Sequence, residues 1–178
     1  MTVKHALTTP PGCLELGPAD LAAGFGGNAG WQNMNLKATA TTKYSSGLLD
    51  LQGHDEIRVA LVMTPAGTNP TAGQVKLTVL QYNADGSVVI QRFDAVTLID
   101  TFQAGNVVQF TFAFGGSRAA ARKDIGSTGT SPTNQGTIAS DVEVLRALSK
   151  VEFIWEVTTA NNAGTSMTGQ GYIFAKAA

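Results

Sequence analysis

Two histidines, His5 and His54, are the only imidazoles available for acid–base, nucleophilic or metal chemistry in this sequence. A general base must stand within hydrogen-bond reach of its nucleophile or substrate. His5 lies in a loose opening segment, and His54 is followed by Asp55 and Glu56 in a turn, the usual setting of a solvated histidine. We therefore expect no catalytic histidine and no transition-metal site.

Carboxylates supply the other chemistry that the residue types allow. Asp50, Asp55 and Glu56 are close in sequence and could help to bind calcium in a β-sandwich, but no D-x-D-x-D loop is present. The 13 acidic residues could also include the paired carboxylates of a glycosidase, because spacing in sequence does not give spacing in space. Neither alternative has positive support, so we expect a protein that is not an enzyme and holds no cofactor or metal.

Two further features resemble known sites but lack the required context. The segment Gly24-Phe25-Gly26-Gly27-Asn28-Ala29 loosely matches the dinucleotide-binding fingerprint, yet a strand pattern follows it where a helix should begin. Cys13 is the single cysteine, so it has no partner for a disulfide or a zinc site. Neither feature indicates a bound cofactor.

Aromatic and basic residues supply the candidate contacts with a partner protein. Phe25 and Trp31 are the aromatic residues of segment 1–32, and they either fold back on this domain's own core or dock on a neighbouring subunit. Arg118, Arg122 and Lys123 form a small basic cluster, which is either a solvated loop or a contact with an acidic patch on a partner. These five residues are the candidate partner-binding residues.

The composition excludes several classes of partner. Charged residues make up 14% of the chain, against roughly 25% in soluble domains, and the net charge is -1. Such a surface has no long-range field to gather nucleic acid or anionic lipid, but it is easily desolvated against another protein. The opening residues contain no apolar signal-peptide stretch. We expect synthesis in a reducing cytoplasm, with neither a nucleic acid nor a membrane as partner.

Alternation of apolar and polar residues predicts strands from residue 35 onward. The clearest case is 151–157, in which Val151, Phe153 and Trp155 face one way. Ser45-Ser46-Gly47 reads as a turn, and Asn83-Ala84-Asp85-Gly86 reads as a hairpin. The expected strands cover residues 35–44, 57–63, 75–82, 88–93, 96–102, 106–114, 151–157 and 167–175.

Segments without this alternation divide the chain. Residues 1–32 are rich in proline and glycine, so we expect an extended N-terminal arm. Residues 115–140 form a long polar loop insert, and the capping-box spacing of residues 140–143 predicts one short helix near 141–148. Residues 33–178 then form one all-β domain, an antiparallel, jelly-roll-like β-sandwich of about eight strands.

One passage carries a family resemblance. Residues 44–59, Tyr-Ser-Ser-Gly-Leu-Leu-Asp-Leu-Gln-Gly-His-Asp-Glu-Ile-Arg-Val, look like the strand–turn–strand opening of β-sandwich proteins in tailed-bacteriophage particles. With its charge-poor remainder, the chain over residues 34–175 resembles capsid decoration (cement) proteins and other accessory virion proteins. The resemblance implies a jelly-roll body in the virion, often trimeric, that binds the lattice of the major capsid protein and stabilises the phage head.

Two alternatives remain at this point. A carbohydrate-binding or receptor-binding module of a phage tail or fibre would hold sugars against exposed aromatic side chains, for which Trp31, Tyr44, Tyr82 and Tyr172 are the candidates. A small jelly-roll major coat protein would assemble into shells without a partner. A row of exposed aromatic side chains would favour the sugar-binding alternative.

Overall fold

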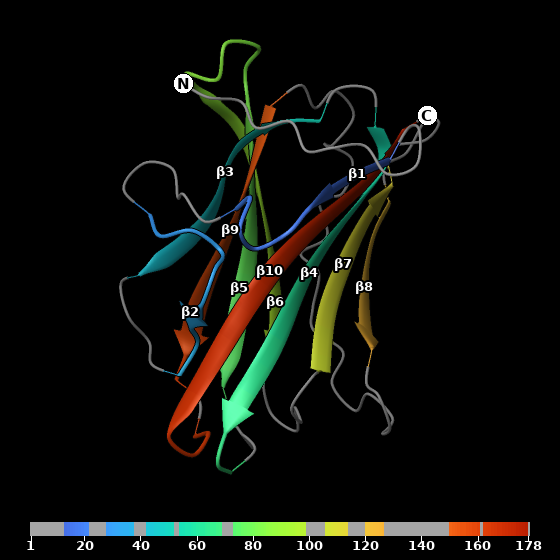
Figure 1. Cartoon of the computed structure of the whole chain (residues 1–178). Helices are drawn as coiled ribbons and strands as arrows, with labels where there is room; N and C mark the ends of the chain where they lie inside the picture. Colours follow the sequence, from blue (N-terminus) through green and yellow to red (C-terminus); the bar gives the residue numbers. More distant parts are fainter. Residues whose placement is uncertain are drawn as a thin grey trace.

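The computed structural model describes residues 13–21, 28–37, 42–51, 54–68, 73–98, 106–113, 120–126, 150–160 and 162–177. Within these ranges the chain forms two sheets, and every pairing between named strands is antiparallel. In Figure 1 the sheet that contains β10 and β4 lies in front of the sheet that contains β5 and β9. The architecture is the β-sandwich that the alternating sequence predicts.

Among the described residues the larger sheet has six strands, and β4 lies at its centre. Its order is β1-β10-β4-β7-β8, and β2 also pairs with β10. The bounds are β1 Cys13–Leu16, β2 Met34–Asn35, β4 His54–Ala66, β7 Asn106–Ala113, β8 Ala120–Gly126 and β10 Ser166–Ala177.

The smaller sheet has four strands in the order β3-β9-β5-β6. The bounds are β3 Lys43–Asp50, β5 Gln74–Tyr82, β6 Val89–Leu98 and β9 Lys150–Thr159. Strand β9 alternates as predicted, since Val151, Phe153, Trp155 and Val157 belong to the buried core. Each such side chain contributes about 1.5–3 kcal/mol when it leaves water.

The pairing of the strands is nested, and this identifies the type of sandwich. When β2 and β8 are set aside, the first remaining strand pairs with the last (β1 with β10), and β3 pairs with β9. Further in, β4 pairs with β7, and β5 pairs with β6. A ribbon of nested antiparallel pairs that is folded over into two sheets is a jelly roll. The predicted fold class is confirmed.

The described part of segment 1–32 belongs to the sandwich, which corrects the prediction of an extended arm there. Strand β1 pairs with β10 at the sheet edge, and Leu16, Leu21 and Trp31 are fully buried. The prolines and glycines break up the local pattern. However, a four-residue edge strand needs only the two inward leucines, Leu14 and Leu16, to dock.

The predicted turn at Ser45-Ser46-Gly47 is a β-bulge inside β3. The register with β9 shifts between Ser45 and Leu48, and Gly47 has a φ of 79°, which glycine adopts without strain. Both serine hydroxyls substitute for missing ladder bonds, since Gly47 N donates to Ser45 Oγ (2.9 Å) and Phe153 N donates to Ser46 Oγ (3.0 Å). The predicted strand 35–44 is likewise changed: β2 ends at Asn35, and β3 begins at Lys43.

Two more predictions change in the middle of the chain. The separate strands expected at 88–93 and 96–102 are one strand, β6, because Asp94 and Ala95 continue the ladder opposite Thr78 and Leu77. The expected loop 115–140 contains strand β8, which pairs with β7 along its whole length although its own residues show no strand period. The helix expected near 141–148 lies outside the described residues.

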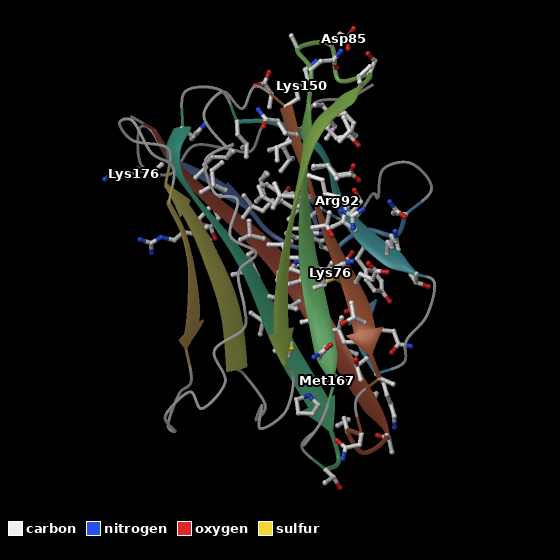
Figure 2. The ribbon with its side chains drawn as sticks, turned by 180° about the vertical axis from the view of Figure 1, so that it is seen from behind. Lys76, Asp85, Arg92, Lys150, Met167 and Lys176 are labelled. Carbon is white, nitrogen blue, oxygen red and sulfur yellow. The ribbon has the colours of Figure 1, made fainter. Side chains whose placement is uncertain are left out.

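The hairpin expected at residues 83–86 is confirmed. Gly86 N donates to Asn83 O (3.0 Å), Asn83 N donates to Val88 O (2.9 Å), and Gly86 has a φ of 79°. This hairpin connects β5 to β6 at one end of the sandwich. In Figure 2, Asp85 marks that end and Met167 lies toward the opposite end.

Candidate functional site

The structure describes three of the five candidate partner-binding residues, Trp31, Arg122 and Lys123. Trp31 is 0% exposed, its Nε1 donates to Tyr44 O (2.8 Å), and its ring lies 6.3 Å from that of Trp155 at an angle of 57°. Of the two placements considered for Trp31, the structure has the one in the domain's own core. The indole therefore offers no surface to a partner in this arrangement.

The other four candidates stay predictions. Phe25 and Arg118 lie outside the described residues. Arg122 and Lys123 lie in β8, where their backbone partners are Thr111 and Phe110 of β7. The cluster is therefore carried at least partly by a strand rather than by the loop that the sequence predicts.

The residues considered for acid–base or metal chemistry do not gather in the described ranges. His54 is half-buried, and its Nδ1 lies 3.3 Å from Leu51 O. Across the described part of the chain, no three His, Cys, Asp or Glu side chains are grouped so that they could hold a metal ion. The same residues contain no helix long and apolar enough to cross a membrane.

A buried hydrogen-bonded cluster of Glu152, Ser45 and Tyr82 lies in the four-stranded sheet. Glu152 is 2% exposed, and both of its carboxylate oxygens accept hydrogen bonds, Oε1 from Ser45 Oγ (2.5 Å) and Oε2 from Tyr82 OH (2.7 Å). Burial, the hydrogen bond to Glu152 and the charge of Glu152 together raise the pKa of Tyr82 above its ordinary value. The cluster connects the β3 bulge to β9 and β5, so its role is to hold these strands together.

The exposed face of β10 offers a different kind of surface. Along this strand Met167, Gly169, Gly171, Ile173 and Ala175 are buried, whereas the alternate residues face outward. We use the name "β10 strip" for the outward residues Thr168, Gln170, Tyr172 and Phe174, together with Asn35, which pairs with Thr168.

Two aromatic rings form one end of the β10 strip. The rings of Tyr172 and Phe174 are nearly parallel (8°), with centroids 6.4 Å apart, and both residues are half-exposed. Tyr172 OH donates to Gln170 Oε1 (3.3 Å), and the exposed Arg58 of β4 lies opposite Phe174. Parallel rings beside amide and guanidinium groups can stack on planar or apolar ligand faces and hydrogen-bond at their margins.

A hollow of about 430 Å³ forms the other end of the β10 strip. It is lined by Asn33, Asn35, Lys37, Thr165, Ser166, Met167 and Thr168. Tyr44 OH donates to Asn35 O (3.0 Å), and Asn35 N donates to Tyr44 OH (2.9 Å), so the wall formed by β2 is held by a buried side chain. Lys37 Nζ donates to the backbone oxygen of Gly164, the residue before Thr165. The lining therefore includes asparagine and hydroxyl side chains as well as the buried Met167, and most of its surface is apolar.

Sequence reasoning found only one residue of the β10 strip. Of the four aromatic candidates, Trp31, Tyr44 and Tyr82 are buried, and Tyr172 alone is half-exposed. The missing signal was the alternation within 167–175: Tyr172 and Phe174 occupy the same face as Thr168 and Gln170, a face that is otherwise polar. Two aromatic residues at polar-face positions could have identified the surface.

Comparisons with known proteins give distant likenesses only. No family model matches the chain, and no curated protein matches its sequence. Lectin II from Ulex europaeus is 7% identical, with 98% of this chain and 96% of the lectin covered and a TM-score of 0.41. The CBM2 module of the evolved Dit of Lactobacillus casei BL23 phage J-1 is 11% identical, with 96% and 92% covered and a TM-score of 0.41. A Bacillus licheniformis β-glucanase is 13% identical, with 96% and 95% covered and a TM-score of 0.37. Likenesses this distant assign no ligand or activity to this chain.

Proposed function

We propose that this chain is a non-catalytic structural protein of a virus particle, a decoration protein that binds the head lattice of a tailed bacteriophage and stabilises it. The observation that carries the proposal is the nested jelly-roll pairing of the strands. A jelly-roll fold is what the resemblance over residues 44–59 implies. In this chain the fold arises from pairings between strands remote in sequence, which no local pattern determines. The proposal thus rests on fold and resemblance together, since a jelly roll alone hosts many functions.

The β10 strip is the surface that we assign to lattice binding. Tyr172, Phe174 and the neighbouring Arg58 are residue types enriched at protein–protein interfaces, and the strip lies on rigid strands rather than on a loop. Its neutral amides and hydroxyls can be desolvated at little cost once they are paired. Binding to assembled heads but not to free subunits would stabilise the heads by mass action.

Co-sedimentation tests this proposal. The test uses heads of the virus that encodes the chain, assembled in the absence of the chain. The purified chain should sediment with these heads and should raise the temperature at which they release DNA. The double variant Tyr172→Ala/Phe174→Ala should bind roughly tenfold more weakly, whereas Lys176→Ala, an exposed change on the same strand, should bind normally. Absence of the chain from gradient-purified particles would exclude the virion role. Shells formed by the chain alone would indicate the coat-protein alternative.

A second candidate function is glycan binding by the same strip. The specific observation in its favour is the hollow at the opposite end of the strip from the two aromatic rings, because its lining includes two asparagines and three hydroxyl side chains. Amides pair with sugar hydroxyls as both donors and acceptors, and rings stack on sugar faces. In this sugar-binding surface, two aromatic rings and a hollow take the place of the row of exposed aromatic side chains that the sequence alternative requires.

Binding to a glycan panel tests the second function. Asn33 has a φ of 56°, so Asn33→Gly removes its amide while keeping the backbone geometry. That variant should lose glycan binding but keep binding to heads if the two ligands use different ends of the strip. No binding of the unsubstituted chain to any glycan at millimolar concentration would reject this candidate.

A further inference from the structure

Strand β6 is an edge of the four-stranded sheet. Among the described residues it pairs with β5 only. It is ten residues long, and both its first residue, Val89 (44%), and the hairpin residue before it, Val88 (55%), are exposed apolar side chains. A long, apolar edge strand presents unpaired backbone groups that favour pairing with another strand.

The other sheet edges are protected by features that residues 91–98 of β6 lack, since the register shift of β6 against β5 lies at its start, between Val89 and Gln91. Strand β1 has only four residues, β3 is interrupted by its bulge, and β8 carries Arg122, Lys123 and Asp124 in succession. Short strands, bulges and charges are the features that prevent edge pairing. Strand β6, Val-Ile-Gln-Arg-Phe-Asp-Ala-Val-Thr-Leu, contains only two charges, on either side of Phe93.

We propose that β6 pairs antiparallel with β6 of a second copy of this chain, about a two-fold axis through Phe93. In this register Arg92 of each copy lies directly opposite Asp94 of the other, and Gln91 lies opposite Ala95. The two four-stranded sheets then join into one continuous sheet, and the interface is self-complementary, as a two-fold dimer requires.

Backbone geometry and charge together select this register. Residues directly opposite one another in an antiparallel pair both point their N–H and C=O groups at the partner or both away. Successive residues of a strand alternate between these two orientations. A residue can therefore lie opposite only itself, or a residue an even number of positions away, in an identical strand. The two-fold axis between two identical strands must then pass through a residue and not between two residues. An axis through Arg92 or Asp94 would put like charges directly opposite, which is destabilising. The axis through Phe93 instead gives two pairs of opposite charge.

Arg92 lies on the exposed face of the four-stranded sheet. Arg92 is exposed, and its β5 partner is Leu80. In Figure 2, Arg92 lies on the outward side of the four-stranded sheet, together with Lys76. Directly opposite residues project from the same face of a sheet, so Arg92 and Asp94 of the partner would meet on that face. The inference concerns self-association and does not depend on which particle or ligand the protein binds.

A charge exchange tests the register through the solution mass. Light scattering with gel filtration should give twice the 18.5 kDa of one chain. Arg92→Asp and Asp94→Arg should each weaken the dimer roughly tenfold or more, because each creates two like-charge pairs across the axis. The double variant Arg92→Asp/Asp94→Arg restores opposite charges and should restore the dimer. Lys43→Asp, an exposed change on the opposite edge strand of the same sheet, should leave the mass unchanged.

Circular dichroism and a thermal melt would establish that each variant is folded. A monomeric or trimeric unsubstituted chain would overturn the inference, as would single variants that remain dimeric or a double variant that stays monomeric. A trimer is the assembly that the resemblance implies, so the measured mass separates the two expectations. Head binding is measured independently, so failure of this pairing would leave the proposed function intact.

Discussion

At the scale of single residues, the most constrained group is the carboxylate of Glu152. It lies among buried side chains, and both of its oxygens accept a hydrogen bond, from Ser45 and from Tyr82. A buried carboxylate that loses a donor bears the cost of its desolvation without compensation. The cluster is therefore a structural device whose removal should lower stability rather than any binding activity.

The first prediction concerns the hydroxyl of Tyr82. Tyr82→Phe removes the donor to Glu152 Oε2 and should lower the free energy of unfolding by about 1–3 kcal/mol, measured by urea denaturation. Tyr172→Phe, which removes a hydroxyl bound at 3.3 Å to the exposed Gln170, should change it by less than about 0.5 kcal/mol. Equal effects of the two substitutions would show that the carboxylate does not depend on Tyr82.

At the scale of elements, short polar residues determine the ends and irregularities of the strands. Serine hydroxyls complete the β3 bulge, and the hairpin between β5 and β6 is closed by its own side chains. In that hairpin Asp85 Oδ1 accepts from Ser87 N (2.8 Å) and from Ser87 Oγ (2.5 Å). These hydrogen bonds, the one from the hydroxyl first, lower the pKa of Asp85 below its ordinary value.

The second prediction follows from the sign of that shift. A carboxyl whose folded pKa is lowered stabilises the hairpin above its unfolded pKa, near about 4, and this contribution is lost as the pH falls through the lower, folded pKa. An NMR titration should therefore give Asp85 a pKa below that of a model peptide. In Ser87→Ala the pKa should rise toward the ordinary value, since the hydroxyl donor is removed. An unchanged pKa in that variant would assign the shift to another cause.

At the scale of the whole molecule, glycines in β10 let the two sheets enclose the Trp31 side chain. A Cβ at Gly171 would overlap the Trp31 ring, and a Cβ at Gly169 would lie 2.6 Å from Leu36 Cδ1. The ring of Trp31 also packs on Trp155 of the other sheet. One indole from segment 1–32 thus contacts both sheets, which makes this segment part of the core.

The third prediction tests that packing. Gly171→Ala should lower the free energy of unfolding by about 1–3 kcal/mol or more, because the ring of Trp31 is enclosed and cannot move away. Gln170→Ala, on the exposed face of the same strand, should have little effect. Near-UV circular dichroism would report the accompanying change around the two tryptophans. A stable Gly171→Ala protein with an unchanged spectrum would contradict this packing.

Local pattern predicted the strands that have strong alternation and missed those that depend on a partner. Residues 151–157 and the hairpin at 83–86 were predicted because their signals are local: apolar residues at every second position, and a glycine where φ is positive. Strands β1 and β8 were missed because an edge strand is formed by hydrogen bonds to its neighbour, whatever its own periodicity. The turn at Ser45-Ser46-Gly47 was mistaken for a chain reversal because a bulge uses the same residue types as a turn.

For the candidate site, Tyr172 was among the aromatic residues considered, whereas the rest of the β10 strip was not. Its members come from β2 and β10, which are more than a hundred residues apart in sequence and meet through the pairing of Asn35 with Thr168 and of Met34 with Gly169. The sequence offered four aromatic residues for a sugar platform, including Tyr172. The other three, Trp31, Tyr44 and Tyr82, are buried in the sandwich and cannot contribute to one.

The amino-acid sequence by itself determined the class of this protein: a charge-poor, all-β sandwich, because charge, composition and period-two alternation are properties of the chain alone. Only the tertiary structure decided which strands pair, which aromatic side chains are buried and which residues form the β10 strip. The physical reason is that these features depend on contacts between segments remote in sequence, and such contacts leave no local signal.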